Sequence, residues 1–158
     1  MWQRIQTVFL AIVIISLIVT IFLPIWIYED PSGKVHELYP LHYTIKTAAT
    51  DGTDRITTYF PYSITAILAI AALTLAFIEI RKYKDRVTQM KLGALNSLFM
   101  AGTITSAVIF SNQFIKTFQG GAYGLGLWLP GVAVICNLLA NRFIRRDEKL
   151  VRDSNRLR

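Results

Sequence analysis

One uninterrupted apolar run constrains this chain more than any other feature. Residues 8–27, VFLAIVIISLIVTIFLPIWI, contain no ionisable side chain. A helix rises about 1.5 Å per residue, so this run would span about 30 Å, which is the thickness of the hydrocarbon core of a bilayer. A core helix of a soluble protein keeps a polar stripe, whereas apolar residues surround this axis on all sides. The run therefore predicts a membrane-spanning helix.

Three further apolar runs follow the first. A hydrophobic content of 53% and a mean hydropathy of +0.43 are high for a soluble domain of 158 residues, and the length indicates a single domain. The first run is longer than the h-region of a signal peptide, and no small-residue cleavage site follows it, so we expect it to remain as a helix. The predicted spans are residues 8–27, 62–80, 92–112 and 125–143.

The segment between the first two spans, residues 28–61, is polar and mixed in charge. Residues 41–47 and 55–60 are rich in β-branched and aromatic residues, and the turn-forming sequence DGTD at 51–54 separates them. We expect a β-hairpin there. The predicted fold class is an all-α membrane protein: a four-transmembrane-helix bundle with a small extracytoplasmic β-hairpin between the first two helices and a cytoplasmic helical tail over residues 144–158.

The distribution of positive charge predicts the orientation. Of the 17 lysines and arginines, thirteen lie in the N-terminal lead, the turn at 81–91 and residues 142–158, and four lie in the two other connections. Cytoplasmic segments carry an excess of such residues, so both termini are predicted to be cytoplasmic in a bacterial inner membrane. The same distribution explains the net charge of +7 without nucleic acid as a partner.

Small and amide side chains indicate how the helices pack. Four small residues recur at intervals of four in the third span and would let another helix approach closely, with alanines of the second span as a counterpart. Two asparagines within spans are expected to donate hydrogen bonds across helix contacts. The predicted helix-packing residues are Gly93, Asn96, Ser97, Ala101, Thr105 and Asn137.

Apolar residues also recur at intervals of seven in the tail. If the fourth helix continues, they form a stripe along a charged rod. Two interpretations have equal weight: the stripe packs on the protein's own 81–91 turn or on anionic headgroups, or it binds a separate chain. The candidate partner-binding residues are Phe143, Leu150, Val151 and Leu157.

Sequence signatures of catalysis are absent. The chain has no nucleophile elbow, zinc-protease motif, Walker loop or dinucleotide fingerprint, so we expect no enzyme activity, catalytic residue, cofactor or metal. Glu79 is the one carboxylate inside a predicted span, and we expect it to pair with Arg81, Lys82 or Lys84 at the interface. The single cysteine, Cys136, is interpreted as a buried inert thiol.

Three residues of the outer segment suggest an alternative. His36, Glu37 and His42 would lie near the headgroups, so a lipid- or small-molecule-handling membrane enzyme or carrier could use them. Their side chains suit a metal such as zinc, but their spacing would keep the two histidines far apart along a strand.

The two ends of the sequence resemble a known family. The opening MWQRIQT, the stretch LANRFIRRDEKLVR at 139–152 and the closing NRLR resemble a family of small bacterial integral membrane proteins that is known as a domain of unknown function and is typical of Bacteroidota. The resemblance covers the whole chain. It implies a four-helix inner-membrane protein and no assigned activity.

These observations lead to one main hypothesis. The chain is expected to be a non-enzymatic accessory or scaffold subunit of a larger membrane complex, in contact with membrane lipids and with other membrane or cytoplasmic chains through its tail. Self-assembly through Gly93, Ser97 and Ala101 is a further alternative.

Overall fold

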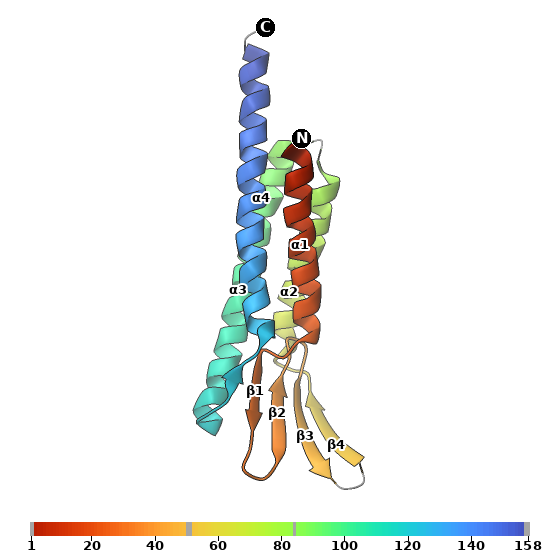
Figure 1. Ribbon diagram of the computed structural model, residues 1–158, viewed down its shortest axis with the longest axis vertical. Coiled ribbons are helices and arrows are strands. Elements are labelled where there is room, and N and C mark those ends of the chain that lie inside the picture. The colour runs from red at the N-terminus through yellow and green to blue at the C-terminus, as the bar shows by residue number, and fades with distance from the viewer. Residues whose placement is uncertain (1, 50–51, 84, 157–158) are drawn as a thin grey trace.

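A computed structural model describes residues 2–49, 52–83 and 85–156 of the chain. In these residues four helices lie roughly along one axis, and five strands gather at one end of them (Figure 1). Each helix contains a stretch that is long and apolar enough to cross a membrane. The helices are α1 (Trp2–Phe22), α2 (Ser63–Arg81), α3 (Arg86–Phe118) and α4 (Leu125–Arg156).

The prediction of an all-α bundle with a small hairpin is wrong. The strands form one five-stranded sheet in the order β4-β3-β2-β1-β5, and every neighbouring pair is antiparallel. The predicted hairpin corresponds to β3 and β4, but two strands precede it and a fifth joins from beyond α3. The strands are β1 (Trp26–Glu29), β2 (Lys34–Leu38), β3 (Tyr43–Ala49), β4 (Gly52–Thr58) and β5 (Ala122–Tyr123).

The first strand begins inside the stretch that was predicted as the end of the first span. The helix α1 ends at Phe22, just before Pro24, whose ring cannot continue a helical hydrogen-bond ladder. The turn after β1 is closed by the Gly33 amide, which donates to the Asp30 carbonyl at 2.8 Å, with Gly33 at a positive φ of 78°. This turn therefore connects the strands β1 and β2, which lie in the segment between the first two helices.

Backbone hydrogen bonds join the beginning of α4 to the residues that directly follow α1. The Gly124 amide donates to the Ile25 carbonyl at 2.8 Å, and the Gly126 amide donates to the Pro24 carbonyl at 3.1 Å. A Cβ atom at Gly126 would lie 2.8 Å from the Pro24 carbonyl oxygen, so the close approach depends on glycine. The short strand β5 and the residues after it thus hold the first and last helices together.

The helices are not a simple bundle, because two of them are much longer than the others. Whereas α2 has 19 residues, α3 has 33 and α4 has 32. In Figure 1 the end of α3 runs down beside the sheet, and the end of α4 extends past the beginning of α1 in the opposite direction. One extension therefore supports the sheet, and the other projects from the rest of the structure.

The buried residues form two clusters. One lies between the four helices and includes small residues such as Ala72 and Ala76 of α2 beside Met100 of α3, with the free thiol of Cys136 in the same cluster. The second lies between the sheet and the extension of α3, where aromatic rings dominate. Its buried residues are Ile25, Trp26, Leu38, Tyr43 and Ala107.

Candidate functional site

The main concentration of buried amide groups lies between α3 and α4, toward the end of the helices that is remote from the sheet. We call it the polar seam. It consists of Gly93 and Ser97 on α3 and Asn137 and Asn141 on α4. All of these except Ser97 are buried.

Hydrogen bonds join the two helices at the seam. The Asn137 amide nitrogen Nδ2 donates to the Gly93 carbonyl at 2.8 Å and contacts the Ser97 hydroxyl oxygen at 2.9 Å. The Ser97 hydroxyl in turn donates to the Gly93 carbonyl at 3.0 Å. Because Asn137 is fully buried, these contacts satisfy its amide nitrogen where water cannot.

The second contact of the seam depends on the missing side chain of Gly93. A Cβ atom there would lie 2.7 Å from the Asn141 side-chain carbon Cγ, closer than real Cβ contacts occur. The Asn141 amide therefore occupies the space that a larger residue would fill. Its oxygen Oδ1 is buried and has no hydrogen-bond partner among the described residues.

The four small residues that were predicted to form one stripe do not all face the same neighbouring helix. Gly93 and Ser97 face α4, whereas Ala101 and Thr105 are exposed. A helix has about 3.6 residues per turn, so each step of four residues drifts by about 40° around the axis. The buried face of α3 instead combines steps of three and four residues, through Gln89, Gly93, Asn96, Met100, Thr103, Ala107 and Ser111.

Glu79 lies deeper than the sequence suggested. It is fully buried, and neither carboxylate oxygen has a hydrogen-bond partner among the described residues, so the expected pairing with Arg81 or Lys82 is absent from the structure. Glu79 follows Ala72 and Ala76 on the buried face of α2, and the two basic residues lie on the exposed side. The third expected partner, Lys84, lies outside the described residues.

Two further amide side chains are buried on α3. The Gln89 nitrogen Nε2 donates to the backbone carbonyl of Glu79 at 3.1 Å, which joins α3 to α2. The Gln89 oxygen has no partner among the described residues. Neither amide atom of Asn96 has one there either, so the predicted hydrogen bond of Asn96 across a helix contact is not formed in the structure. The helix end remote from the sheet therefore contains several unsatisfied polar atoms.

The sheet separates the three residues of the alternative hypothesis. His36 faces α3: its nitrogen Nδ1 lies 2.5 Å from the Tyr43 hydroxyl, and its ring centroid lies 4.6 Å from that of Phe118. Glu37, the next residue of β2, points to the opposite face because side chains alternate along a strand. There its carboxylate accepts from Lys46 at 2.6 Å and from the Tyr39 hydroxyl at 2.9 Å.

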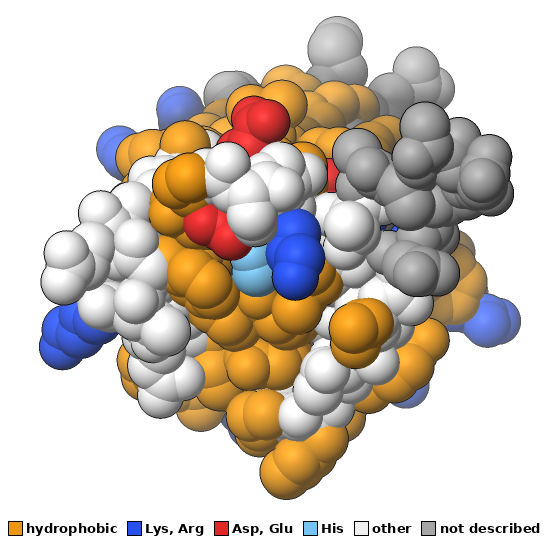
Figure 2. Space-filling view, turned by 90° about the horizontal axis from the view of Figure 1, so that it is seen from below, with side chains coloured by type: hydrophobic (Ala, Val, Ile, Leu, Met, Phe, Trp, Pro, Cys, Tyr) orange, Lys and Arg blue, Asp and Glu red, His pale blue; other side chains and the backbone are white. Residues whose placement is uncertain are grey.

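His42 stacks on Tyr39 with ring centroids 5.0 Å apart, so it does not join His36 either. Burial lowers the pKa of both histidines and raises the pKa of Tyr43 to about 12. Figure 2 views the sheet end and shows a histidine beside acidic and basic side chains, with hydrophobic side chains around them. In the described part of the chain no three histidine, cysteine or acidic side chains are grouped as for a metal.

The predicted partner-binding residues divide into two sets. The Phe143 ring stacks on Phe9 of α1 with a centroid distance of 5.6 Å, so it belongs to the contact between α1 and α4. Leu150 and Val151 lie on the projecting end of α4 and are exposed by 54% and 42%. Leu157 lies outside the described residues.

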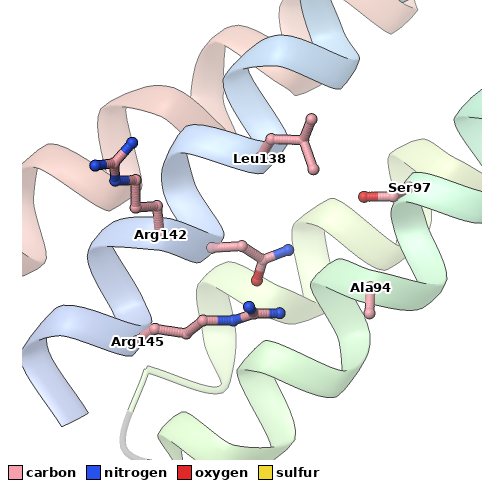
Figure 3. A pocket seen from close by; sticks show the side chains of 6 residues that line it. Ala94, Ser97, Leu138, Arg142 and Arg145 are labelled. Atoms are coloured by element: carbon pink, nitrogen blue, oxygen red, sulfur yellow. The ribbon is translucent and has the colours of Figure 1, made fainter. Parts of the chain in front are cut away.

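One feature that the sequence analysis missed is a cavity beside the polar seam. It has a volume of about 500 Å³ and lies between α3 and α4 (Figure 3). The sequence signal that could have indicated this polar side of α4 is the spacing of Asn137, Asn141 and Arg145, which recur at intervals of four residues. The lining residues are Ala94, Ser97, Leu138, Asn141, Arg142 and Arg145.

The comparisons with known proteins agree with the resemblance at the two ends of the sequence. The model of one protein family, described as a domain of unknown function (DUF4293), matches residues 2–157. No curated protein matches the chain.

Proposed function

The chain belongs to the DUF4293 family of unknown function, and from that premise we propose that it is a non-enzymatic, multi-pass protein of the bacterial inner membrane. In this proposal it serves as an accessory or scaffold subunit of a larger complex, with both termini in the cytoplasm. The sheet then lies on the outer side of the membrane and the projecting end of α4 on the inner side.

The observation that carries the proposal is the apolar surface of the helices. Large apolar side chains are more than 60% exposed on α2, α3 and α4 alike, at Ile67, Leu98 and Ile135. Soluble monomers rarely expose such continuous apolar surface, because each buried square ångström is worth about 25 cal/mol in water. In a bilayer the same side chains contact lipid, so the surface carries no such cost.

The projecting end of α4 supports a role as a scaffold. It extends past the beginning of α1 (Figure 1), and Leu150 and Val151 are exposed among charged residues there. An exposed apolar pair on a projecting helix end gains stability when a second chain covers it. We therefore propose that this end binds a membrane or cytoplasmic partner.

Cysteine labelling tests the membrane placement. In a Cys136→Ala background, Ser32→Cys marks the turn between β1 and β2, and Asp153→Cys marks the end of α4; both positions are exposed. We expect an impermeant maleimide to label the first in intact spheroplasts and the second only after lysis. Labelling of both in intact spheroplasts, or release of the protein by alkaline carbonate, would contradict the proposal.

Crosslinking in native membranes tests the scaffold role. A photo-reactive residue at position 150 or 151 should give a defined crosslinked species, and Leu150→Ala with Val151→Ala should remove the partner from mild-detergent purifications. The matched control is Ile135→Ala, which removes an exposed apolar side chain from the middle of α4. A chain that remains monomeric in every preparation would refute the scaffold role.

A further inference from the structure

We propose that the cavity between α3 and α4 binds the phosphate group of an anionic glycerophospholipid with a hydroxylated headgroup, such as phosphatidylglycerol. The proposal rests on the membrane placement proposed above. Beyond that placement, it specifies a lipid ligand from the membrane leaflet that lies on the same side as the projecting end of α4.

The cavity combines polar and apolar walls as a lipid headgroup site requires. Its volume of about 500 Å³ lies within the usual range for small-ligand pockets. Arg145 and Asn141 line it toward the end of α4, while Leu138 and Ala94 form the part nearer the middle of the helices. A phosphate would lie against the first pair, and the glycerol and the start of the acyl chains against the second.

Two guanidinium groups supply the positive charge. Arg142 and Arg145 are exposed, lie three residues apart on α4, and have no ion pair with a carboxylate among the described residues. In Figure 3 Arg145 reaches across the gap toward α3, whereas the Arg142 side chain leaves α4 on the side away from α3, at the edge of the cavity. A guanidinium donates two parallel hydrogen bonds to phosphate oxygens, so Arg145 is the main ligand in the proposal.

A buried polar atom points to a ligand with a hydrogen-bond donor. Asn141 is 7% exposed, and its oxygen Oδ1 has no partner among the described residues. A buried acceptor without a partner is costly, and a headgroup hydroxyl in the cavity would satisfy it. Choline headgroups offer neither a hydroxyl nor a net negative charge, so the site should discriminate against them.

The position of the cavity along the membrane normal also suits a lipid headgroup. Arg142 is at the end of the apolar part of α4, and on the neighbouring α3 the Gly93 contact with Asn141 lies two residues from the charged Lys91. Basic pockets between helices at the cytoplasmic boundary of a membrane are suited to anionic headgroups.

The test measures lipid retained by the full-length protein in detergent by native mass spectrometry. Phosphatidylglycerol and phosphatidylcholine are added in equal amounts, and inorganic phosphate is added in a separate arm. The variants are Arg145→Gln and Arg142→Gln/Arg145→Gln. The control is Lys149→Gln/Arg152→Gln, which removes the same charge from exposed positions of α4 outside the cavity.

We expect wild type and the control to retain one phosphatidylglycerol in preference to phosphatidylcholine. The double cavity variant should retain at least fivefold less, with unchanged helix content by circular dichroism. Equal retention by all proteins, equal loss in the control, or displacement of the lipid by millimolar phosphate would overturn the proposal. If the labelling experiment shows membrane insertion, such a result refutes the lipid site alone.

Discussion

At Gly93 the helices α3 and α4 are in close contact, because the Asn141 amide occupies the position of the missing side chain. Gly93→Ala should therefore destabilise the protein by about 1–3 kcal/mol, the usual cost of overpacking. The measurement is the midpoint of thermal unfolding in detergent. A midpoint equal to that of wild type would show that α4 moves away without cost.

The same helix provides the matched control for this substitution. A Cβ atom at Gly102 would meet only the Leu68 side chain, at an ordinary distance of 3.5 Å. Gly102→Ala should leave the midpoint unchanged or raise it slightly, because alanine favours a helix over glycine.

The carboxylate of Glu79 gives a second prediction for a single residue. Because it is buried without a partner among the described residues, Glu79→Gln loses no ion pair and should preserve or raise the unfolding midpoint. For comparison, Asp147→Asn removes the ion pair in which the Asp147 carboxylate lies 3.1 Å from the Arg86 guanidinium. This substitution should lower the free energy of unfolding by about 1 kcal/mol or less. A lower midpoint for Glu79→Gln than for Asp147→Asn would reveal a partner of the carboxylate.

Single residues show how far the sequence could predict the site. Asn137 was predicted to donate across a helix contact because an amide in an apolar helix needs a partner, and the structure shows that bond. The partners of Asn141 and the burial of Glu79 depend on the rotation of each helix about its axis. If a helix is rotated by one residue position about its axis, such a residue moves from the core to the surface. The amino-acid composition of the helix does not determine this rotation.

At the scale of elements, the structure contains more strand than the sequence indicated. The hairpin β3–β4 was predictable from its β-branched residues and its turn. The strand β1 was hidden by an apolar sequence that also suits a helix, and β5 has only two residues. Such segments become strands because Trp26 pairs with Leu38 on one side and with Tyr123 on the other, contacts that are distant in the sequence.

The contact between the sheet and α3 depends on Phe114. Its ring centroid lies 4.5 Å from that of Tyr43 and 5.3 Å from that of Trp26. Phe114→Ala should cost about 3–5 kcal/mol and expose the sheet to limited proteolysis before the helices are cleaved. The control Ile56→Ala alters a side chain of β4 that is 65% exposed and should have little effect. Uniform cleavage of sheet and helices would contradict the role of this contact.

The same contact predicts a pH dependence. Burial lowers the pKa of His36, so the folded sheet favours the neutral ring, while the unfolded chain binds a proton near the ordinary value of about 6.5. The stabilisation from His36 is complete above that value and is lost as the pH falls through the lowered pKa. The pKa of His42 is also lowered by burial, so its contribution to stability has the same pH dependence.

Thermal unfolding between about pH 7.5 and pH 5 measures this effect. The midpoint of wild type should fall on acidification, and His36→Gln/His42→Gln should reduce the fall. An identical fall in the double variant would assign the effect to other groups.

At the scale of the whole molecule, the projecting end of α4 should be separable from the fold. Deletion of residues 149–158 leaves Asp147 with its bond to Arg86 and should change the free energy of unfolding by less than about 0.5 kcal/mol. The unfolding midpoint in detergent checks this expectation, and loss of the folded state on deletion would refute it. The scaffold proposal predicts that the same deletion abolishes the crosslinks.

The four apolar helices were predictable because length and composition suffice to identify them. The continuation of the fourth helix into the predicted tail was also expected, and α4 runs as far as Arg156. The continuation of α3 to Phe118 was not expected, since its last residues lie against the sheet through ring contacts such as those of Phe114 and Phe118 with Trp26.

The backbone bonds from Gly124 and Gly126 to the residues that directly follow α1 have a mechanical consequence. They make the sheet end a pivot from which α4, at about 1.5 Å per residue, extends as a lever of about 48 Å over its 32 residues. A tilt of about 5° at the pivot would displace the far tip by about 4 Å. A small rotation of the strands would therefore become a larger displacement at the opposite end of the molecule, where α4 could act on a partner.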